Sequence, residues 1–181
     1  MNKKYALGYY YLGSKGCGKS TLAILNASTR AAANDWGFFY YVTPTAQVPD
    51  VPVKRSVNLV PVLPDSERTK FLKWFSKIRN CVVVIDDFAA VFAGLDTSQK
   101  QEFRAVLTTT RQRCVEVHIV GQTAELIPSF APLSLFGGVF FFRHPVVWSV
   151  VKPKIGGFLT KEEYEPLMSL ENYQHKEFIL N

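Results

Sequence analysis

The stretch Gly13-Ser14-Lys15-Gly16-Cys17-Gly18-Lys19-Ser20 decides the fold, because it fits the pattern G-x-x-x-x-G-K-[ST] without a mismatch. Glycines let such a loop wrap with its backbone N–H groups pointing inward, so that they form a nest for phosphate oxygens. A helix expected to begin near Lys19 adds the positive end of its dipole. The pattern therefore predicts a site for the phosphates of a nucleotide.

The residues of this loop have separate expected tasks in binding ATP. Lys19 is expected to reach the β- and γ-phosphates, and the Ser20 hydroxyl to contact a Mg²⁺ ion. Thr21 is expected to pack against the α-phosphate or to hydrogen-bond with it, while Lys15 occupies a variable position of the pattern. The predicted nucleotide-binding residues are Gly13, Ser14, Lys15, Gly16, Cys17, Gly18, Lys19, Ser20 and Thr21.

Strand-like and helix-like segments alternate along the chain. The predicted strands are Tyr5–Leu12, Phe38–Val42, Ser56–Val60, Cys81–Ile85, Val115–Val120 and Val139–Phe142, and the predicted helices cover 19–33, 67–78 and 98–109. Several of the strands are apolar throughout, which is typical of a mostly parallel sheet with helices on both faces. The sequence therefore predicts an α/β fold whose ligands bind beyond the carboxyl ends of the strands.

The end of the chain is expected to add strands and a helix over residues 146–181. Val147–Val151 is expected to form a strand that pairs with Val139–Phe142 around His144-Pro145. Thr160 and Glu163 have the spacing of a capping box, and we expect an amphipathic helix after them.

An acidic pair follows the apolar strand Cys81–Ile85. We expect Asp86 to hold Mg²⁺, through its water shell or together with Ser20. Asp87 is expected to polarise the attacking water and act as general base. Aspartate also commonly caps a following helix, so the prediction depends on the phosphate loop being present.

A glutamine follows the strand Val115–Val120. If this strand lies beside the strand that ends at Asp86, Gln122 could touch the γ-phosphate or its attacking water and report hydrolysis. The alternative is a polar residue in an ordinary turn. His118, on the same strand, is interpreted as a hydrogen-bonded core residue, and the aromatic runs Tyr9–Tyr11, Phe38–Tyr41 and Phe140–Phe142 as core.

The composition is that of an ordinary globular protein. The 181 residues include 48% apolar and 20% charged residues, which predicts one folded domain and excludes a mainly disordered chain. No apolar stretch approaches the roughly 20 residues of a membrane span, and no signal peptide is recognised, so we expect an intracellular protein that is not secreted. The three cysteines follow no metal pattern and are expected to be reduced thiols.

Basic residues outside the loop are candidates for contacts with polyanions and with other subunits. The formal net charge is +6, which permits a nucleic-acid partner without requiring one. Arg111 and Arg113 are the main candidates for an arginine finger offered to a neighbouring subunit, ahead of Arg104 and Arg143. The candidates for DNA contacts are Lys54, Arg55 and Lys100.

Three blocks together resemble the FtsK–HerA superfamily of P-loop motors, and within it the small genome-packaging ATPases of double-jelly-roll viruses. The blocks are Gly13–Thr21, Val82–Phe88 and Thr110–Gln122, the last with its arginine-bearing connection into a strand that ends near glutamine. Tyr41-Val42-Thr43-Pro44 also resembles the viral members. The resemblance covers residues 5 to about 145 and is only architectural beyond them.

The resemblance implies a RecA-like core that hydrolyses ATP to ADP and phosphate with Mg²⁺. It also implies a ring of identical subunits, a hexamer or a pentamer, with ATP between subunits and an arginine reaching across. Such a ring would translocate double-stranded DNA into a preformed capsid. The expected locations are the host cytoplasm and the packaging vertex of the virion.

Three other functions use the same loop. A small-molecule or nucleotide kinase would need a lid with several arginines, whereas the chain after Val120 holds only Arg143. A filamentous-phage assembly ATPase of the Zot kind normally carries a membrane span. A nucleotide-binding module without hydrolysis would not need water-positioning groups such as Asp87 and Gln122.

Overall fold

The computed structural model describes residues 8–36, 38–45, 48, 50–53, 57–61 and 66–180. The strands within these ranges form one seven-stranded sheet in the order β3-β2-β4-β5-β1-β6-β7. Their bounds are β1 Tyr9–Leu12, β2 Phe38–Thr43, β3 Val57–Pro61, β4 Cys81–Ile85, β5 Val115–Gly121, β6 Gly138–Phe142 and β7 His175–Ile179. Neighbouring strands are parallel except for β6 and β7, which are antiparallel. The predicted α/β fold with a mostly parallel sheet is confirmed.

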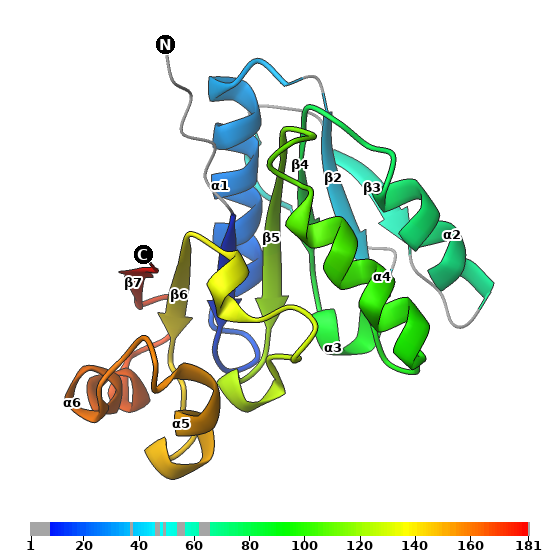
Figure 1. Ribbon diagram of the computed structural model, residues 1–181. Coiled ribbons are helices and arrows are strands. Elements are labelled where there is room, and N and C mark those ends of the chain that lie inside the picture. The colour runs from blue at the N-terminus through cyan, green and yellow to red at the C-terminus, as the bar shows by residue number, and fades with distance from the viewer. Residues whose placement is uncertain are drawn as a thin grey trace.

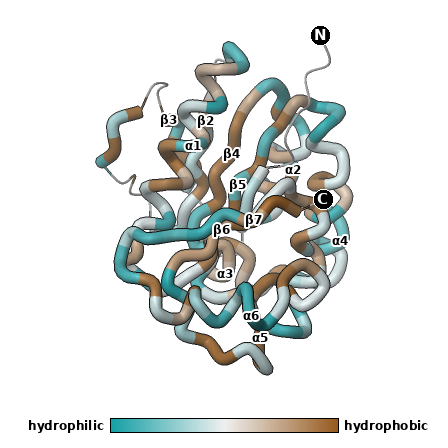
Figure 2. Tube along the Cα trace, turned by 90° about the vertical axis from the view of Figure 1, so that its left-hand side faces the viewer, coloured by the Kyte–Doolittle hydropathy of each residue, from teal (hydrophilic) through white to brown (hydrophobic). Residues whose placement is uncertain are grey.

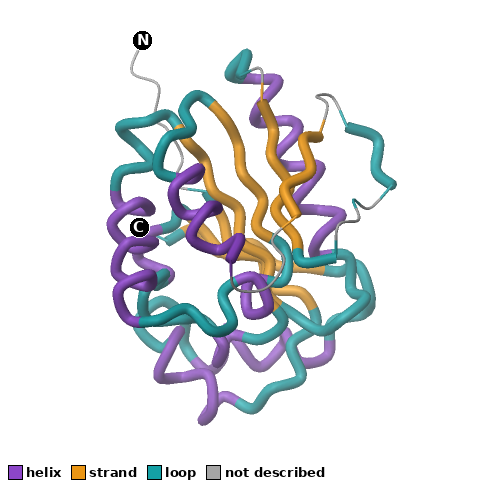
Figure 3. Tube along the Cα trace, turned by 90° about the vertical axis from the view of Figure 1, so that its right-hand side faces the viewer, coloured by secondary structure: helices purple, strands orange, loops and turns teal. Residues whose placement is uncertain are grey.

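Helices cover both faces of the sheet, as Figures 1 and 3 show. The helix α1 lies on one face, and α2 and α4 lie on the other. The helical bounds are α1 Lys19–Ala33, α2 Ser66–Phe75, α3 Phe88–Val91, α4 Thr97–Thr108, α5 Trp148–Ile155 and α6 Lys161–Tyr164, with 3₁₀ turns at Ala124–Leu126, Leu133–Leu135 and Glu165–Ser169. No helix in the described ranges has the length and apolar character needed to cross a membrane.

The central strand β4 shows why a fully apolar run becomes a strand here. Successive side chains of a strand point to opposite faces. Val82 and Val84 belong to the cluster under α1, whereas Val83 and Ile85 belong to the cluster under α2 and α4. Both faces are buried, so β4 has no polar position. Figure 2 shows this hydrophobic strand inside the molecule and the hydrophilic start of β7 at the sheet edge.

The C-terminal part of the chain differs from the prediction. The segment expected as the strand Val147–Val151 belongs to α5, because Val151 and Ile155, four residues apart, are the side chains that it buries. The capping box of Thr160 and Glu163 is present, but the helix α6 that it starts is short. The chain then continues as the 3₁₀ turn Glu165–Ser169, with Pro166 near its start, instead of a long amphipathic helix.

The strand on the outer side of β6, opposite β1, is therefore β7, from the part of the tail expected to be helical. Most of its residues are exposed, while Phe178 packs against the core and the His175 ring contacts Phe140 and Phe142 of β6. Main-chain hydrogen bonds to β6, together with Phe178, hold a segment whose hydropathy pattern does not predict a strand.

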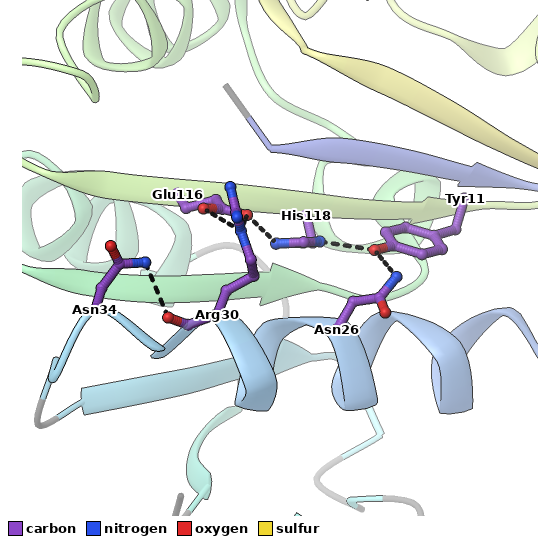
Figure 4. Close-up of polar contacts among 6 residues, drawn as sticks. All are labelled: Tyr11, Asn26, Arg30, Asn34, Glu116 and His118. Atoms are coloured by element: carbon purple, nitrogen blue, oxygen red, sulfur yellow. Dashed lines mark hydrogen bonds and ion pairs between the residues drawn. The ribbon is translucent and has the colours of Figure 1, made fainter. Parts of the chain in front are cut away.

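A chain of polar side chains joins α1 to β5 and β1, and its members on the two strands are buried (Figure 4). Arg30 Nε donates to both carboxylate oxygens of Glu116, at 3.1 and 3.2 Å. The same carboxylate lies 3.0 Å from His118 Nε2, and His118 Nδ1 lies 2.8 Å from the Tyr11 hydroxyl. The amide of Asn26 also donates to that hydroxyl, at 3.1 Å. The interpretation of His118 as a hydrogen-bonded core residue is confirmed.

The hydrogen bonds and charge interactions of Glu116 with His118 and Arg30 outweigh the effect of desolvation on its carboxyl. Burial by itself raises the pKa of the Glu116 carboxyl, but His118 and Arg30 hold it below its usual range. A carboxylate that is buried but paired and hydrogen-bonded stays ionised, and it keeps its partners in one arrangement.

Candidate nucleotide site

The phosphate loop lies between β1 and α1 and is anchored by the two neighbouring strands. Gly13 N donates to Gln122 O at 3.0 Å, and Ser14 N donates to Arg143 O at 2.9 Å. A side chain at Gly13 would place its Cβ 2.7 Å from the Cβ of Phe142, so only glycine fits against β6. The loop is thus fixed at the carboxyl ends of β5 and β6.

The end of the loop is the start of α1. Gly18 is the residue before the helix, and its φ of 94° lies in the left-handed region that favours glycine. The first free N–H groups of α1 face the loop, because an α-helix leaves those groups without partners within the helix. The sequence-predicted helix Lys19–Ala33 and its position behind the loop are confirmed.

The Lys19 side chain is folded into the loop, and only 8% of the residue is exposed. Its amine donates to Ser14 O at 2.5 Å and lies 3.7 Å from Cys17 Sγ. Cys17 is buried, and its thiol also donates to Ser14 O, at 2.8 Å. Lys15, by contrast, is exposed on the same loop.

The Tyr41 hydroxyl joins the two predicted Mg²⁺ ligands, Asp86 and Ser20. It donates to Asp86 Oδ2, while Asp86 Oδ1 accepts from Asp87 N at 2.8 Å. Burial and the nearby Asp86 carboxylate raise the pKa of Tyr41, and a hydrogen bond with Ser20 acts in the opposite direction. Tyr41 is thus neutral and holds the Asp86 carboxylate toward Ser20.

These oxygen atoms fit a magnesium ion held mainly by nucleotide phosphates. Mg²⁺ is typically bound through one or two protein oxygen ligands plus phosphates and water. Among the described residues, no group of three or more His, Cys, Asp or Glu side chains gathers into a separate metal site. The sequence analysis missed Tyr41 because it counted the whole run Phe38–Tyr41 as core. The position of Tyr41 near the carboxyl end of a strand could have indicated that its hydroxyl belongs to the site.

Substitution of Tyr41 by phenylalanine should lower the affinity for the Mg²⁺ that supports nucleotide binding. Loss of the hydroxyl leaves Asp86 Oδ2 without its donor, so we expect the Mg²⁺ concentration needed for half-maximal ADP binding to rise several-fold. A fluorescent ADP analogue titrated with Mg²⁺ measures this. Tyr10→Phe is the matched control, because it also loses a buried hydrogen bond, to Ala131 O. Equal shifts in both variants would contradict the role of Tyr41.

Asp87 lies directly after β4, at the position before α3. Its backbone is left-handed, with φ 48° and ψ 57°, and its side chain makes no capping hydrogen bond to α3 in the described structure. Aspartate is among the residues that adopt this backbone most readily, so the conformation is accommodated without a glycine. The alternative interpretation of Asp87 as a helix cap is therefore wrong, and its role as general base stays a prediction.

The strand order brings Gln122 between the loop and the acidic pair. β5 pairs with β1 on one side and with β4 on the other, as the prediction for Gln122 requires. Gln122 follows β5 directly and is exposed, while its carbonyl accepts the hydrogen bond from Gly13 N. The geometry places its side chain at the edge where Asp86, Asp87 and the loop also lie. Its contact with a phosphate or a water stays a prediction.

The arginines predicted as fingers lie at the opposite end of β5. This strand has seven residues, so Arg111 and Arg113 are about 20 Å from the loop of their own chain. The guanidinium of Arg113 is buried and donates to the carbonyls of Phe75, Ile78 and Val106 at 2.7, 3.1 and 3.0 Å. The prediction of Arg113 as a finger is corrected: it ties α2, α4 and β5 together. Arg111 is exposed and stays a candidate.

The other described basic candidates lie on α4 and beside the phosphate loop. Arg104 donates to Ser129 O at 3.2 Å, and Lys100 is exposed on the same helix, α4. Arg143 is exposed beside the loop, to which its carbonyl is bonded. Lys54 and Arg55 lie outside the described residues.

A buried histidine fixes the chain after Gln122, which the sequence analysis did not foresee. His144 Nε2 accepts from Ala124 N at 2.8 Å, so the neutral ring carries its hydrogen on Nδ1 and donates to the Tyr164 hydroxyl. Tyr164 in turn donates to Val146 O at 2.8 Å. Burial lowers the pKa of His144 to about 4.

His144 predicts a loss of stability in weak acid. Between pH 6.5 and about 4 this histidine takes up a proton in the unfolded chain but not in the folded one. The free energy of unfolding should therefore fall with falling pH, by up to about 1.4 kcal/mol per pH unit from this group. Urea unfolding between pH 7 and 4.5 measures it. The variant His144→Gln should show a shallower dependence, and identical slopes would contradict the assignment.

Comparisons with known proteins identify the fold. No protein-family model matches the chain, and no curated protein matches its sequence. Among solved structures, the genome packaging NTPase B204 from Sulfolobus turreted icosahedral virus 2, in complex with AMP, aligns over 96% of both chains with a TM-score of 0.61 and 13% identity. The DNA-packaging ATPase B204 from Sulfolobus turreted icosahedral virus aligns over 96% of this chain and 98% of its own, with a TM-score of 0.62 and 13% identity.

The fold is also found in EssC, over part of the chain. The structure of EssC (ATPases 2 and 3) from Geobacillus thermodenitrificans aligns over 76% of this chain and 32% of its own, with a TM-score of 0.52 and 13% identity. The chain has the P-loop NTPase fold that the genome-packaging NTPase B204 and the EssC ATPases share, as the three sequence blocks predicted.

Proposed function

We propose that the protein is an ATP-hydrolysing motor that moves double-stranded viral DNA into a preformed capsid. The observation that carries the proposal is the meeting of the phosphate loop, the acidic pair and Gln122 at one edge of the sheet. The likeness to B204 over nearly the whole length of both chains supports the packaging role. B204 is described as a packaging NTPase, and structures of it hold AMP and ATP-gammaS.

Each residue of the site has a separate role in the hydrolysis of ATP. The loop N–H groups and Lys19 hold the β- and γ-phosphates and offset the charge that develops on them. Asp87 accepts a proton from the attacking water, and Gln122 orients that water. Ser20 and Asp86, positioned by Tyr41, hold Mg²⁺. When bound, the ion neutralises phosphate charge.

Assembly and DNA binding complete the proposal. Copies of the chain form a closed ring, a hexamer or a pentamer, in which Arg111 or Arg143 of one copy stabilises the phosphates held by the next. The net charge of +6 favours DNA, and we assign contacts with DNA to the exposed Lys100 and Arg104 of α4. The ring works in the host cytoplasm at the packaging vertex of the capsid.

ATP hydrolysis with and without double-stranded DNA tests the proposal. We expect turnover that DNA stimulates and that salt suppresses, because phosphate contacts release counterions. The variant Lys19→Ala serves as the blank. Phosphorylation of an added metabolite instead of water would contradict the motor and support a kinase.

A further inference from the structure

A small cavity adjoins the phosphate loop on the side away from the acidic pair. Its volume is about 150 Å³, and Gly18 and Thr21 form its end toward the loop. The remaining walls come from Leu22 and Leu25 of α1, from Phe142 of β6, and from Tyr173 and His175 at the start of β7. The cavity is thus bounded by aromatic and aliphatic side chains.

The strand order determines which part of a nucleotide can reach this cavity. Asp86 and Gln122 follow β4 and β5, on one side of β1, whereas the cavity lies by β6 and β7, on the other side. A triphosphate in the loop with its γ end toward Asp86 has its nucleoside end toward Thr21. The base of a bound nucleotide is the group that would lie against Tyr173.

Tyr173 has an unusual conformation for a tyrosine. It lies in a turn closed by Gln174 N donating to Glu171 O at 3.2 Å, and its φ of 68° is in the left-handed region. Glycine or asparagine is favoured at such a turn position, and a bulky side chain is strained there. The residue is nevertheless 72% exposed, so burial does not explain it.

The same turn is bonded to the phosphate loop. Tyr173 N donates to Cys17 O at 3.2 Å, and the Tyr173 ring lies so close to Gly18 that a Cβ there would be 2.8 Å from Cδ1. The His175 ring packs on Phe142, with ring centroids 5.2 Å apart, and continues the aromatic wall. A strained, exposed aromatic ring held against a glycine of the loop has the properties of a stacking platform.

We infer that this cavity binds the base of the nucleotide by stacking on Tyr173, with little preference among bases. Every base has a π face, whereas discrimination requires fixed groups that hydrogen-bond to its edge. In the described cavity the side chains able to do so are Thr21, Tyr173 and His175, and the other lining groups are apolar. The inference rests on the proposed function, because it requires that the loop binds the phosphates.

Calorimetric binding of three probes with Mg²⁺ tests the inference: ATP, GTP and inorganic tripolyphosphate. For the unaltered protein we expect similar affinities for ATP and GTP, within about threefold, and at least tenfold weaker binding of tripolyphosphate. Tyr173→Gly should weaken both nucleotides about tenfold and leave tripolyphosphate unchanged. This variant should also fold at least as stably, because glycine adopts the left-handed backbone without strain.

Tyr173→Phe is the matched control, since it keeps the ring and removes only the hydroxyl. It should bind all three probes like the unaltered protein. Nucleotide binding unaffected by Tyr173→Gly, or tripolyphosphate weakened as much as ATP, would overturn the stacking platform while leaving the phosphate site in place. A preference of tenfold or more for one nucleotide would contradict the inference that the cavity does not discriminate among bases. Failure of tripolyphosphate and nucleotides to bind at all would overturn the proposed function.

Discussion

Replacement of Lys19 by alanine is expected to lower ATP turnover about a thousandfold, because no other loop side chain carries a buried positive charge to the β- and γ-phosphates. The Lys19 amine already lies inside the loop, 2.5 Å from Ser14 O. Bound phosphates would replace this carbonyl as its partner. Steady-state phosphate release measures the loss of turnover, and thermal unfolding shows whether the variant is folded.

Lys15→Ala is the matched control for this prediction. Lys15 carries the same charge on the same loop but is exposed to solvent. Its removal should change turnover less than threefold, since exposed charges are screened by water and salt. Equal losses in the two variants would show that the total charge of the loop matters and not the position of Lys19.

The substitution Asp87→Asn should reduce turnover by about a thousandfold and leave ATP binding unchanged. The amide has the shape of the carboxylate but cannot accept the proton of the attacking water. Asparagine tolerates the left-handed backbone of this position, so the variant should keep its stability. Single-turnover hydrolysis together with equilibrium binding of ATP separates the two effects.

Asp35→Asn is the control for Asp87→Asn, because it makes the same change at another aspartate with a left-handed backbone. Asp35 is also an aspartate with positive φ, 54°, and it follows α1 at the end away from the loop. Its replacement should not change turnover. If Asp87→Asn hydrolysed ATP at a normal rate, another group would have to act as the base, and the assignment of Asp87 would be wrong.

Local patterns predicted the elements that carry the site. The loop has a fixed spacing of glycines and a lysine, and β4 is apolar because both of its faces are buried. Since the carboxyl ends of parallel strands meet at one edge, Asp86 and Gln122 could be placed near the loop before the strand order was known. The tertiary structure adds that β5 separates β1 from β4.

The errors have physical causes that lie outside local sequence. The run Val147–Val151 favours a strand by its β-branched residues, yet burial of Val151 and Ile155 in one stripe selects a helix. β7 forms because β6 offers it a main-chain partner, and its own hydropathy gives no signal. Arg113 and Tyr41 were misassigned because the partners of a buried polar group come from segments distant in the sequence.

The polar side chains between α1 and β5 have a mechanical consequence for the loop. The surface that α1 turns to the sheet carries mostly small side chains, and the buried residues are Ala23, Ala27, Ser28 and Ala31 together with the larger Ile24. The hydrogen bonds of Arg30 and Asn26 are directional, and a shift of one residue, about 1.5 Å, would break them. Asn26 lies about 10 Å and Arg30 about 16 Å along the helix from Lys19, so both contacts fix the position of α1 along the sheet. The position of the phosphate-binding end of α1 is thus set in part by contacts two and three turns further along the same helix.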